Sequence, residues 1–327
     1  MKSIKIAGFI SLCFWATTSV VAQKHTLKFN PDGKFKIVQF TDVHMKAGNP
    51  ASDIALERIH SITNDEKPDL IIFTGDVTTS GEAGLRIVAQ EVEKHKIPFM
   101  ILFGNHDDEH GSSRLDLYKA MRDYTYYLHE GDSLSENQEI VVKTANNTPG
   151  AVLYCFDSHA YAQKKDVGGY AWLTQQQIQW YRESSRKMTR QNKNTPYPAV
   201  AFFHIPLPEY KEAACDEGAA LFGTRMEKSC PPKINTGMFA AMREMGDIMG
   251  VFVGHDHDND YAVMWHDIVL AYGRYTGGNT VYNNLPNGGR VIVLEENKRT
   301  FSSWIVDADN KEAHKVTYPD SFVRKNK

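Results

Sequence analysis

Five short apolar runs in this chain each end at residues of the kinds that bind metal ions. Runs of this length, bounded by Gly or Pro, are typical of buried strands. The runs and the polar residues that follow them are Phe35–Phe40 with Asp42 and His44, Leu70–Phe73 with Asp76, Phe99–Phe103 with Asn105, His106 and Asp107, Ala199–Phe203 with His204, and Ile248–Val253 with His255 and His257. In open α/β sheets, ligands bind just beyond the carboxyl ends of the strands. The sequence therefore predicts one polynuclear metal site.

The segments between these runs alternate between helical and strand-like patterns. Ala51–Glu66 has a helical apolar face, and a second helix is predicted near Gly84–His95. This βαβαβ order predicts neighbouring, mostly parallel strands with helices packed outside them. Further strands are predicted at Ile140–Thr144, Ala151–Phe156 and Pro198–Phe203. A helix is predicted at Thr174–Gln191, with Thr174 as its N-cap and Gln177 at the reciprocal capping-box position.

The C-terminal third has the pattern of antiparallel hairpins. Tyr261–Trp265 and Ile268–Tyr272 form one expected hairpin, and Arg290–Glu295 and Thr300–Val306 form another. Consecutive antiparallel strands indicate a second sheet, or an antiparallel extension packed on the first. With no internal repeat or linker in the sequence, we expect one compact α/β domain over residues 23–327.

Residues 1–22 have the pattern of a secretory signal peptide. Lys2 and Lys5 precede an apolar stretch, Ile6–Trp15, and small residues lead to a plausible cleavage site after Ala22. The apolar stretch is shorter than the roughly 20 residues that a membrane-spanning helix needs. We therefore expect an exported protein, periplasmic or extracellular, without a stable membrane anchor.

Charge and cysteine content limit the partners and the compartment. The chain has 37 basic and 40 acidic residues, and removal of residues 1–22 changes its formal net charge from −3 to −5. This balance argues against nucleic acid as a partner. In an oxidising compartment, Cys215 and Cys230 would form a disulfide that closes a loop of about 15 residues, worth roughly 3 kcal/mol. Two free thiols are the alternative.

Seven side chains are candidate metal ligands: Asp42, His44, Asp76, Asn105, His204, His255 and His257. Imidazole together with carboxylate suits zinc, iron or manganese, and the absence of thiolate excludes a soft site. Seven ligands are more than one tetrahedral ion needs. They suit two divalent or trivalent ions roughly 3.5–4 Å apart that share one carboxylate. Asp76, alone after its strand, is the candidate for this bridge.

Such a centre has a net positive charge and suits hydrolysis of a phosphate ester. The ions would bind the phosphoryl oxygens, and a metal-bridging hydroxide would attack phosphorus in line with the leaving group. The departing oxygen then needs a proton. His106, beside Asn105 but not needed as a ligand, is the candidate donor, and Asp107 is the candidate residue to orient its ring.

The ordered motifs Asp-x-His, Gly-Asp, Gly-Asn-His-Asp, a lone His and Gly-His-x-His resemble those of the calcineurin-like metallophosphoesterase superfamily. The match extends from Asp42 to His257. The resemblance implies an α/β sandwich of two mixed β-sheets flanked by helices. It also implies one metal ion held by Asp42, His44, Asp76 and His257, and a second held by Asp76, Asn105, His204 and His255. His106 would contact the substrate and assist the leaving group.

Within this superfamily, the chain is similar in character to exported proteins related to purple acid phosphatases. Those enzymes carry a tyrosine three residues after the bridging aspartate, and here that position is Thr79. The purple colour of a ferric–tyrosinate pair is therefore not expected, and the ferric–divalent pairing is not implied either.

We expect an exported phosphomonoesterase that acts on a small molecule or a phosphoprotein. A phosphodiesterase acting on nucleotides or lipids would use the same metals and is the nearest alternative. An alternative of another class is a non-catalytic, metal-containing binding protein. His106 and a full set of ligands argue against it, because a degenerate relative would be expected to lose one of them.

Three other features have a structural interpretation beside a functional one. Asp256, between two candidate ligands, is expected to orient a ligand rather than bind the metal. Arg274 is expected to form an ion pair, with a bidentate contact to phosphate as the functional alternative. The segment Pro206–Asn235 is predicted to be irregular and to lie near the site, where it could act as a lid that selects the substrate.

Overall fold

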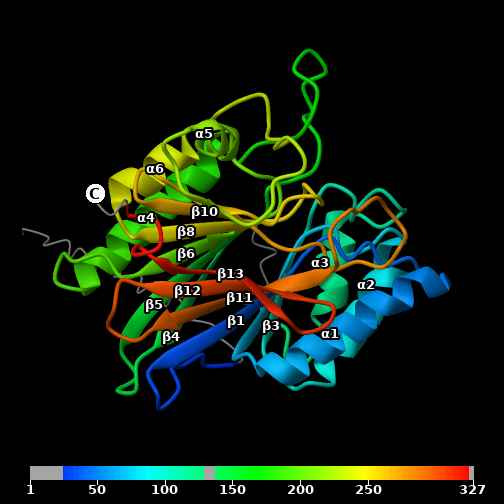
Figure 1. Cartoon of the computed structure of the whole chain (residues 1–327), viewed down its shortest axis with the longest axis horizontal. Helices are drawn as coiled ribbons and strands as arrows, with labels where there is room; N and C mark the ends of the chain where they lie inside the picture. Colours follow the sequence, from blue (N-terminus) through cyan, green and yellow to red (C-terminus); the bar gives the residue numbers. More distant parts are fainter. Residues whose placement is uncertain (1–24, 129–136, 324–327) are drawn as a thin grey trace, which may run out of the picture.

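The computed structural model describes residues 25–128 and 137–323. The signal peptide predicted at residues 1–22 lies outside the described residues and stays a prediction. Two mixed β-sheets face one another, and helices cover their outer faces (Figure 1). The predicted fold class, an α/β sandwich of two mixed sheets flanked by helices, is confirmed.

The first sheet has six strands in the order β13-β12-β11-β1-β2-β3. Its strands are β1 (Lys34–Phe40), β2 (Leu70–Thr74), β3 (Phe99–Leu102), β11 (Gly288–Glu295), β12 (Phe301–Asp307) and β13 (Glu312–Tyr318). The strands β1, β2 and β3 are parallel, and the pairs β1–β11, β11–β12 and β12–β13 are antiparallel. The apolar runs of β1, β2 and β3 therefore end at the same edge of this sheet.

The second sheet has seven strands in the order β4-β5-β6-β8-β10-β9-β7. Its strands are β4 (Asn137–Lys143), β5 (Pro149–Phe156), β6 (Ala199–Phe202), β7 (Leu221–Phe222), β8 (Ile248–Val253), β9 (Ala262–Trp265) and β10 (Ile268–Tyr272). The strands β5, β6, β8 and β10 are parallel, and the outer pairs are antiparallel. The carboxyl ends of β6 and β8 supply the second half of the predicted site.

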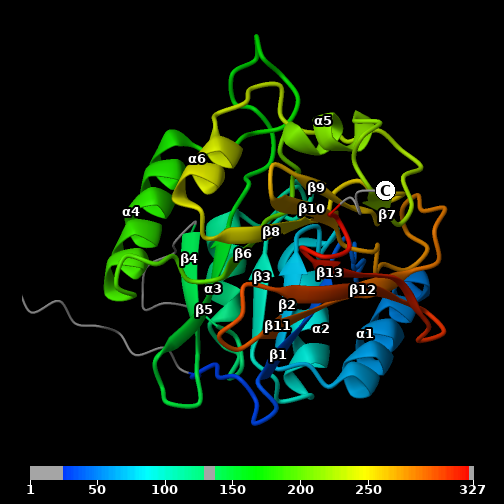
Figure 2. The same cartoon turned by 60° about the vertical axis from the view of Figure 1, so that its left-hand side comes forward.

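Helices lie on the two outer faces of the sandwich (Figures 1 and 2). One side carries α1 (Asp53–Glu66), α2 (Gly81–Glu93) and α3 (Arg114–Met121), together with the short 3₁₀ helix η1 (Pro50–Ser52). The other side carries α4 (Gln175–Gln191), α5 (Glu209–Cys215) and α6 (Met238–Met245). The capping box predicted for α4 is present, since Thr174 and Gln177 each accept a hydrogen bond from the other's backbone N–H.

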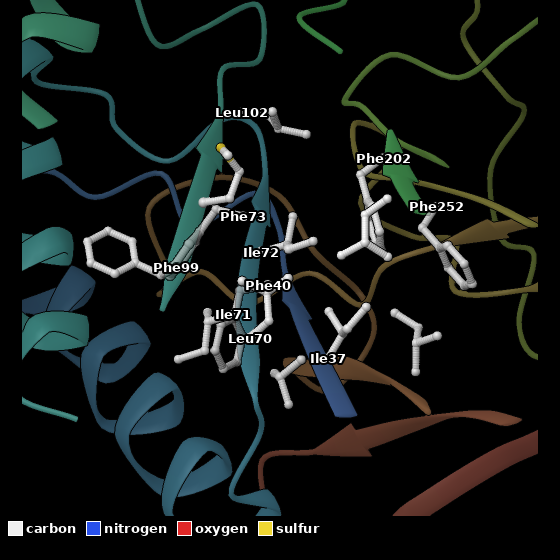
Figure 3. Close-up of a cluster of buried hydrophobic side chains, with 14 of the residues drawn as sticks. Ile37, Phe40, Leu70, Ile71, Ile72, Phe73, Phe99, Leu102, Phe202 and Phe252 are labelled. Atoms are coloured by element: carbon white, nitrogen blue, oxygen red, sulfur yellow. The ribbon is translucent and has the colours of Figure 1, made fainter. Parts of the chain in front are cut away.

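The main hydrophobic core includes residues of both sheets. Figure 3 shows side chains of β1, β2 and β3 together with Phe202 and Phe252 from β6 and β8. The rings of Phe202 and Phe252 stack at 5.4 Å between centroids, and both are fully buried. Full burial of such a side chain contributes about 1.5–3 kcal/mol. This core holds the two sheets against each other, and so fixes the strand ends from which the candidate ligands extend.

Of the two alternatives for the C-terminal hairpins, the structure has antiparallel extensions: β9–β10 extends the seven-stranded sheet and β11–β12 extends the six-stranded one. Two other expectations are corrected. The segment Pro206–Asn235 is not irregular throughout, since it contains α5 and β7. The disulfide hypothesis is wrong for this structure: Cys215 and Cys230 are both free and exposed.

Candidate metal centre

The candidate ligands come together at the edge where parallel strands of both sheets end. Asp42 and His44 follow β1, and Asp76 follows β2. The backbone N–H of Asp42 donates to the carbonyl of Gly75 at 3.0 Å, and that of His44 donates to the carbonyl of Asp76 at 2.9 Å. These bonds hold the two loops side by side beyond the sheet. Parallel pairing thus brings ligands distant in sequence into one site.

A first group of ligand atoms belongs to Asp42, His44 and His257, all buried and all within 4.8 Å of one another. The Nε2 atoms of His44 and His257 lie 3.1 Å apart, and Nε2 of His257 lies 3.6 Å from Oδ1 of Asp42. Two residues of this group come from the six-stranded sheet and one from the seven-stranded sheet. The three donor atoms can therefore converge on one ion.

A second group belongs to Asp76, His204 and His255, which are also buried and within 4.8 Å of one another. Nε2 of His204 lies 3.1 Å from Oδ2 of Asp76 and 3.3 Å from Nδ1 of His255. The same Asp76 oxygen lies 3.8 Å from Nε2 of His44, a member of the first group. Asp76 is therefore the carboxylate that lies between the two groups, as its isolated position in the sequence predicts.

Hydrogen bonds fix the orientation of these ligands. Nδ1 of His204 contacts the carbonyl of Thr74 at 2.8 Å, and Nδ1 of His257 contacts the carbonyl of Tyr282 at 2.8 Å. A carbonyl accepts only from a protonated nitrogen, so Nε2 of each ring is the atom with a lone pair for a metal. Asp76 is held by its other oxygen, since Oδ1 accepts the backbone N–H of His106 at 2.8 Å.

Asn105 provides the test of whether a cation fits here. Its Nδ2 donates to the hydroxyl of Tyr161 at 3.2 Å, whereas its Oδ1 is buried and has no hydrogen-bond partner among the described residues. A buried carbonyl oxygen without a partner costs about 1–3 kcal/mol. Coordination to a metal ion would satisfy that oxygen, and the imidazole and carboxylate donors around it suit zinc, iron or manganese. The residues therefore fit a metal centre.

The electrostatics of the candidate ligands in both groups also suit a cation. Burial lowers the pKa of His44 to about 3, so its imidazole is neutral at physiological pH, the state in which it can bind a metal. Burial alone would raise the pKa of Asp76, but His204 beside it holds that pKa well below the ordinary value. Burial likewise opposes protonation of His204, yet Asp76 and Asp42 raise its pKa to about 9. In the metal-free state, a proton on His204 thus balances the carboxylates.

Four of the candidate ligands have left-handed backbone conformations. The φ angles are 54° at Asp42, 47° at His44, 50° at Asp76 and 83° at His255. A residue other than glycine in this region costs on the order of 1–3 kcal/mol, and such residues cluster at functional sites. These conformations turn the chain sharply after each strand and direct the side chains to a common point.

His106 lies beside the ligands, and its ring centroid is 5.6 Å from that of His44. Its side chain is 40% exposed, so it is accessible to a substrate at the centre. The prediction that Asp107 orients this ring is wrong. The carboxylate of Asp107 accepts the backbone N–H groups of Thr78 at 2.8 Å and Gly104 at 2.7 Å, so it fixes the loop instead.

Glu109 is the residue that contacts the His106 ring, with 2.6 Å between its Oε2 and Nδ1. The other carboxylate oxygen of Glu109 accepts the hydroxyl of Tyr161 at 2.8 Å. Sequence reasoning missed both residues. The spacing of three residues between His106 and Glu109 was an available signal for Glu109, because such pairs meet within one turn. Tyr161 had no comparable signal.

Three tyrosines surround the ligand group. The Tyr282 ring stacks on His257 with 4.5 Å between centroids, and the Tyr170 ring meets His255 edge-on at 4.3 Å. Tyr161 and Tyr170 stack at 5.8 Å and belong to the loop 158–172, which projects at the top of Figures 1 and 2. Tyr161 and Tyr282 are both exposed. The centre therefore has an aromatic rim, defined by Tyr161, Tyr170 and Tyr282.

The remaining expectations for single residues can now be compared with their contacts. Arg274 forms the predicted ion pair, with the buried carboxylate of Asp260. Asp256 accepts the hydroxyl of Tyr272 at 2.6 Å and the backbone N–H of Cys230 at 3.2 Å, so it ties the segment Pro206–Asn235 to the loop after β8. Neither Tyr272 nor Cys230 is a candidate ligand, so these hydrogen bonds do not support the role predicted for Asp256, orientation of a ligand.

Two facing mixed sheets, with carboxylate and imidazole donors gathered at their strand ends, form the fold and the candidate metal site of the metallophosphoesterase class. The chain belongs to the calcineurin-like phosphoesterase family, whose model matches residues 35–259. This match contains every predicted ligand, from Asp42 to His257. The suspected superfamily is confirmed.

Relatives in other organisms carry contrasting names. The chain is 28% identical to a protein of Arabidopsis thaliana named "Probable inactive purple acid phosphatase 14", over 93% of this chain and 86% of the relative. It is 29% identical to Phosphatase DCR2 of Saccharomyces cerevisiae, over 91% of this chain but 58% of the relative. A dimetal phosphatase from Danio rerio has a similar fold, with a TM-score of 0.55, 13% identity, and coverage of 86% of this chain and 98% of that one.

Across residues 25–128 and 137–323, no helix combines the length and the apolar character needed to span a bilayer.

Proposed function

We propose that this chain is an exported, dinuclear metal-dependent phosphomonoesterase in which His106 is the proton donor. The observation that carries the proposal is the pair of ligand groups that meet at Asp76, whose Oδ2 lies 3.1 Å from His204 and 3.8 Å from His44. A carboxylate between two groups of donor atoms is the arrangement expected where two ions share one ligand.

The proposed assignment of ligands follows the two groups, with Asn105 added to the second because of its unpartnered oxygen. One ion would be held by Asp42, His44, Asp76 and His257, and the other by Asp76, Asn105, His204 and His255. When bound, manganese, iron or zinc ions would supply Lewis acidity toward phosphoryl oxygens and lower the pKa of a bound water toward neutrality.

His106 would hold the proton that the leaving oxygen needs. Its Nδ1 is engaged by Glu109, so Nε2 is the atom left to donate. Burial alone would lower the pKa of His106, but Asp76 and Glu109 raise it above the ordinary value. The raised pKa favours the protonated imidazole near neutral pH, as a general acid requires.

The aromatic rim and the nearby carboxylates support a monoester with a single phosphate group. Tyr161, Tyr170 and Tyr282 offer ring faces to an apolar or aromatic substituent. Glu109 and Glu227, the latter bonded to the Tyr282 hydroxyl at 3.2 Å, would repel further anionic groups on the substrate. The second candidate, a phosphodiesterase, would use the same metals and differs in the second ester substituent that it must accept.

The names of the relatives divide between an enzyme and an inactive protein, so activity has to be measured. The protein would be reconstituted separately with manganese, zinc or iron and assayed with p-nitrophenyl phosphate and bis-p-nitrophenyl phosphate. We expect faster cleavage of the monoester. Faster cleavage of the diester would favour the phosphodiesterase, and cleavage of neither with any metal would favour the non-catalytic binding protein.

Two variants separate metal binding from proton donation. Asp76→Ala should lose both metal and turnover, because it removes the shared ligand. His106→Ala should retain metal but lose about 10²–10⁴-fold in turnover of an alkyl phosphate, whose leaving group needs a proton. His110→Ala, which removes an exposed histidine from the same loop, is the matched control. Unchanged alkyl phosphate turnover in His106→Ala would rule out the donor role.

Export is proposed from the pattern of residues 1–22 alone. Expression of the full chain in a bacterial host, followed by fractionation and N-terminal sequencing, tests it directly. We expect a periplasmic or secreted product that begins at Gln23. A cytoplasmic product that retains Met1–Ala22 would contradict this part of the proposal and leave the enzymatic part intact.

A further inference from the structure

A third group of side chains of metal-ligating types lies on the helical side of the six-stranded sheet, away from the metal centre. His60 belongs to α1, Glu91 belongs to α2, and His95 follows α2. His95 comes shortly before the amino end of β3, whereas Asn105 comes after its carboxyl end. The group therefore lies at the opposite end of β3 from the predicted ligands.

The donor atoms of this group converge on a small volume. One atom from each of His60, Glu91 and His95 lies within 4.8 Å of the other two. Nδ1 of His60 is 3.2 Å and Nε2 of His95 is 4.0 Å from the same Glu91 oxygen, Oε1. The two imidazole rings lie 5.0 Å apart between centroids. Three donors directed at one point suit an ion about 2 Å from each of them.

One donor atom of this group, Nε2 of His95, lacks a hydrogen-bond partner among the described residues. The His95 side chain is only 7% exposed, yet its Nε2 is buried without a hydrogen bond to any described residue, because 4.0 Å to Glu91 is too long for one. A buried polar nitrogen without a partner costs about 1–3 kcal/mol. A metal ion between His95 and Glu91 would satisfy this nitrogen without any change in the backbone.

The neighbouring side chains leave the converging atoms free. Lys94 binds the other carboxylate oxygen of Glu91, Oε2, at 2.6 Å, so Oε1 still faces both imidazoles. The Asn64 amide contacts Nε2 of His60 at 2.8 Å, which leaves Nδ1 directed toward Glu91. Rotation of that amide by a half turn would present an oxygen to Nε2–H, the tautomer in which Nδ1 can bind a metal.

The protonation states of His95 and Glu91 are those that metal ligands need. Burial lowers the pKa of His95, so its imidazole is neutral near pH 7. Burial alone would raise the pKa of Glu91, but hydrogen bonds from Lys94 and His60 hold it below the ordinary value, so the carboxylate is ionised. Two imidazoles and one carboxylate form a donor set that proteins use for zinc, with water as the fourth ligand.

We propose that His60, Glu91 and His95 form a zinc-binding site that joins α1 to the end of α2. The His60 side chain is 56% exposed, which leaves the outer side of the site open for a water ligand. The site is independent of the proposed phosphoesterase activity, because none of its residues belongs to the metal centre. A bound zinc ion would stabilise the packing of α1 against α2.

The test compares the zinc content of the full chain with that of His60→Ala. Both proteins are dialysed against free zinc in the micromolar range and their metal content is measured. We expect the variant to hold one zinc ion fewer per chain. Because the His60 side chain is exposed, its removal leaves the core intact, and circular dichroism would verify the fold. His314→Ala, which removes an exposed histidine on β13, should hold as much zinc as the wild type.

Thermal unfolding provides a second readout. Zinc should raise the Tm of His60→Ala less than that of the wild type, because the variant lacks the link between α1 and α2. His95→Ala, which removes the buried ligand, should give the same loss of one zinc ion. Equal zinc content in His60→Ala and the wild type would overturn the proposal, whatever the catalytic activity of the protein.

Discussion

His106 and its contacts lie in one short turn after β3, where adjacent residues have different tasks. Asn105 presents an unpartnered oxygen to the metal centre, His106 faces the solvent side, and Asp107 is directed into the loop to bind backbone N–H groups. The carboxylate of Glu109, three residues further along the chain, contacts the His106 ring. Substitution of Asn105 should therefore affect metal binding, substitution of His106 should affect proton donation, and substitution of Asp107 should affect the conformation of the loop.

Glu109→Gln should impair proton donation and leave metal binding intact. The amide would retain a contact to Nδ1 of His106 but would no longer stabilise the protonated ring with a negative charge. We expect turnover of an alkyl phosphate to fall about tenfold, with a smaller effect on p-nitrophenyl phosphate, whose leaving group needs no proton. Steady-state kinetics on both esters would measure this. An equal loss on both would indicate a structural effect instead.

Gly104→Ala should remove the metal centre while the fold is retained. A Cβ at this position would overlap Oδ1 of Asp76 and lie 2.5 Å from the backbone nitrogen of Asp76. The overlap would displace Asp76, with a destabilisation of about 1–3 kcal/mol. Elemental analysis and thermal unfolding would measure both effects. Gly111→Ala is the control, since a Cβ there meets no atom within 4 Å and only its φ of 84° is unfavourable. Full metal content in Gly104→Ala would refute this explanation.

Sequence reasoning located the ligands better than their supporting contacts. The residue types and the spacing after each strand are sufficient to place Asp42 or His204 at a strand end, because chain direction fixes that position. Which atom a carboxylate faces depends on the turn conformation, and this is why the sequence pointed to Asp107 and not to Glu109 as the partner of the His106 ring. Tyr161 reaches the site from the distant loop 158–172, and its position depends on tertiary packing that no local pattern encodes.

At the scale of elements, the buried strands were the most predictable. The runs that became β2, β3 and β8 are continuously apolar because both faces of each strand are covered. The short helices α3, α5 and α6 were not assigned, since eight or fewer residues give little periodicity to detect. The partners of the hairpins could not be predicted either, because the same alternating pattern allows pairing with either sheet.

The contact between α4 and the start of β8 predicts a pH-dependent stability. Asp247, almost fully buried, accepts the hydroxyl of Tyr181 from α4. Burial raises the pKa of Asp247 above its ordinary value. The folded chain therefore keeps this proton at a pH where the unfolded chain has lost it. The resulting stabilisation is complete below the ordinary pKa and is lost as the pH rises through the raised pKa.

Asp247→Asn should remove this loss of stability at rising pH, because asparagine keeps an oxygen acceptor for Tyr181 and does not ionise. We expect the Tm of the variant, relative to the wild type, to increase from acidic to neutral pH. Thermal unfolding across this range would measure the difference. Asp309→Asn, at an exposed position, should show no such trend. A constant difference between Asp247→Asn and the wild type would argue against the raised pKa.

At the scale of the whole molecule, each group of candidate ligands includes residues from both sheets. Asp42 and His44 meet His257 in one group, and Asp76 meets His204 and His255 in the other. The metal centre thus links the two layers at one edge, in addition to the core between them.

Removal of metal should therefore lower the stability of the whole domain. A ligand that binds only the folded state, at about a hundred times its Kd, stabilises that state by about 2.7 kcal/mol. We expect treatment with a strong chelator to lower the Tm, and manganese or zinc to restore it. Asp76→Ala should respond less, because it lacks the shared ligand. An unchanged Tm after verified removal of metal would show that the layers are held by the core alone.

The division of each ligand group between the layers has a consequence for the order of assembly. A nascent chain in which only one layer has formed lacks at least one proposed ligand of each ion. Binding of metal by the full set of ligands must then follow the docking of the layers rather than guide it. Loaded protein would therefore mark chains that have completed their tertiary structure, and immature chains would not sequester scarce transition metals during synthesis.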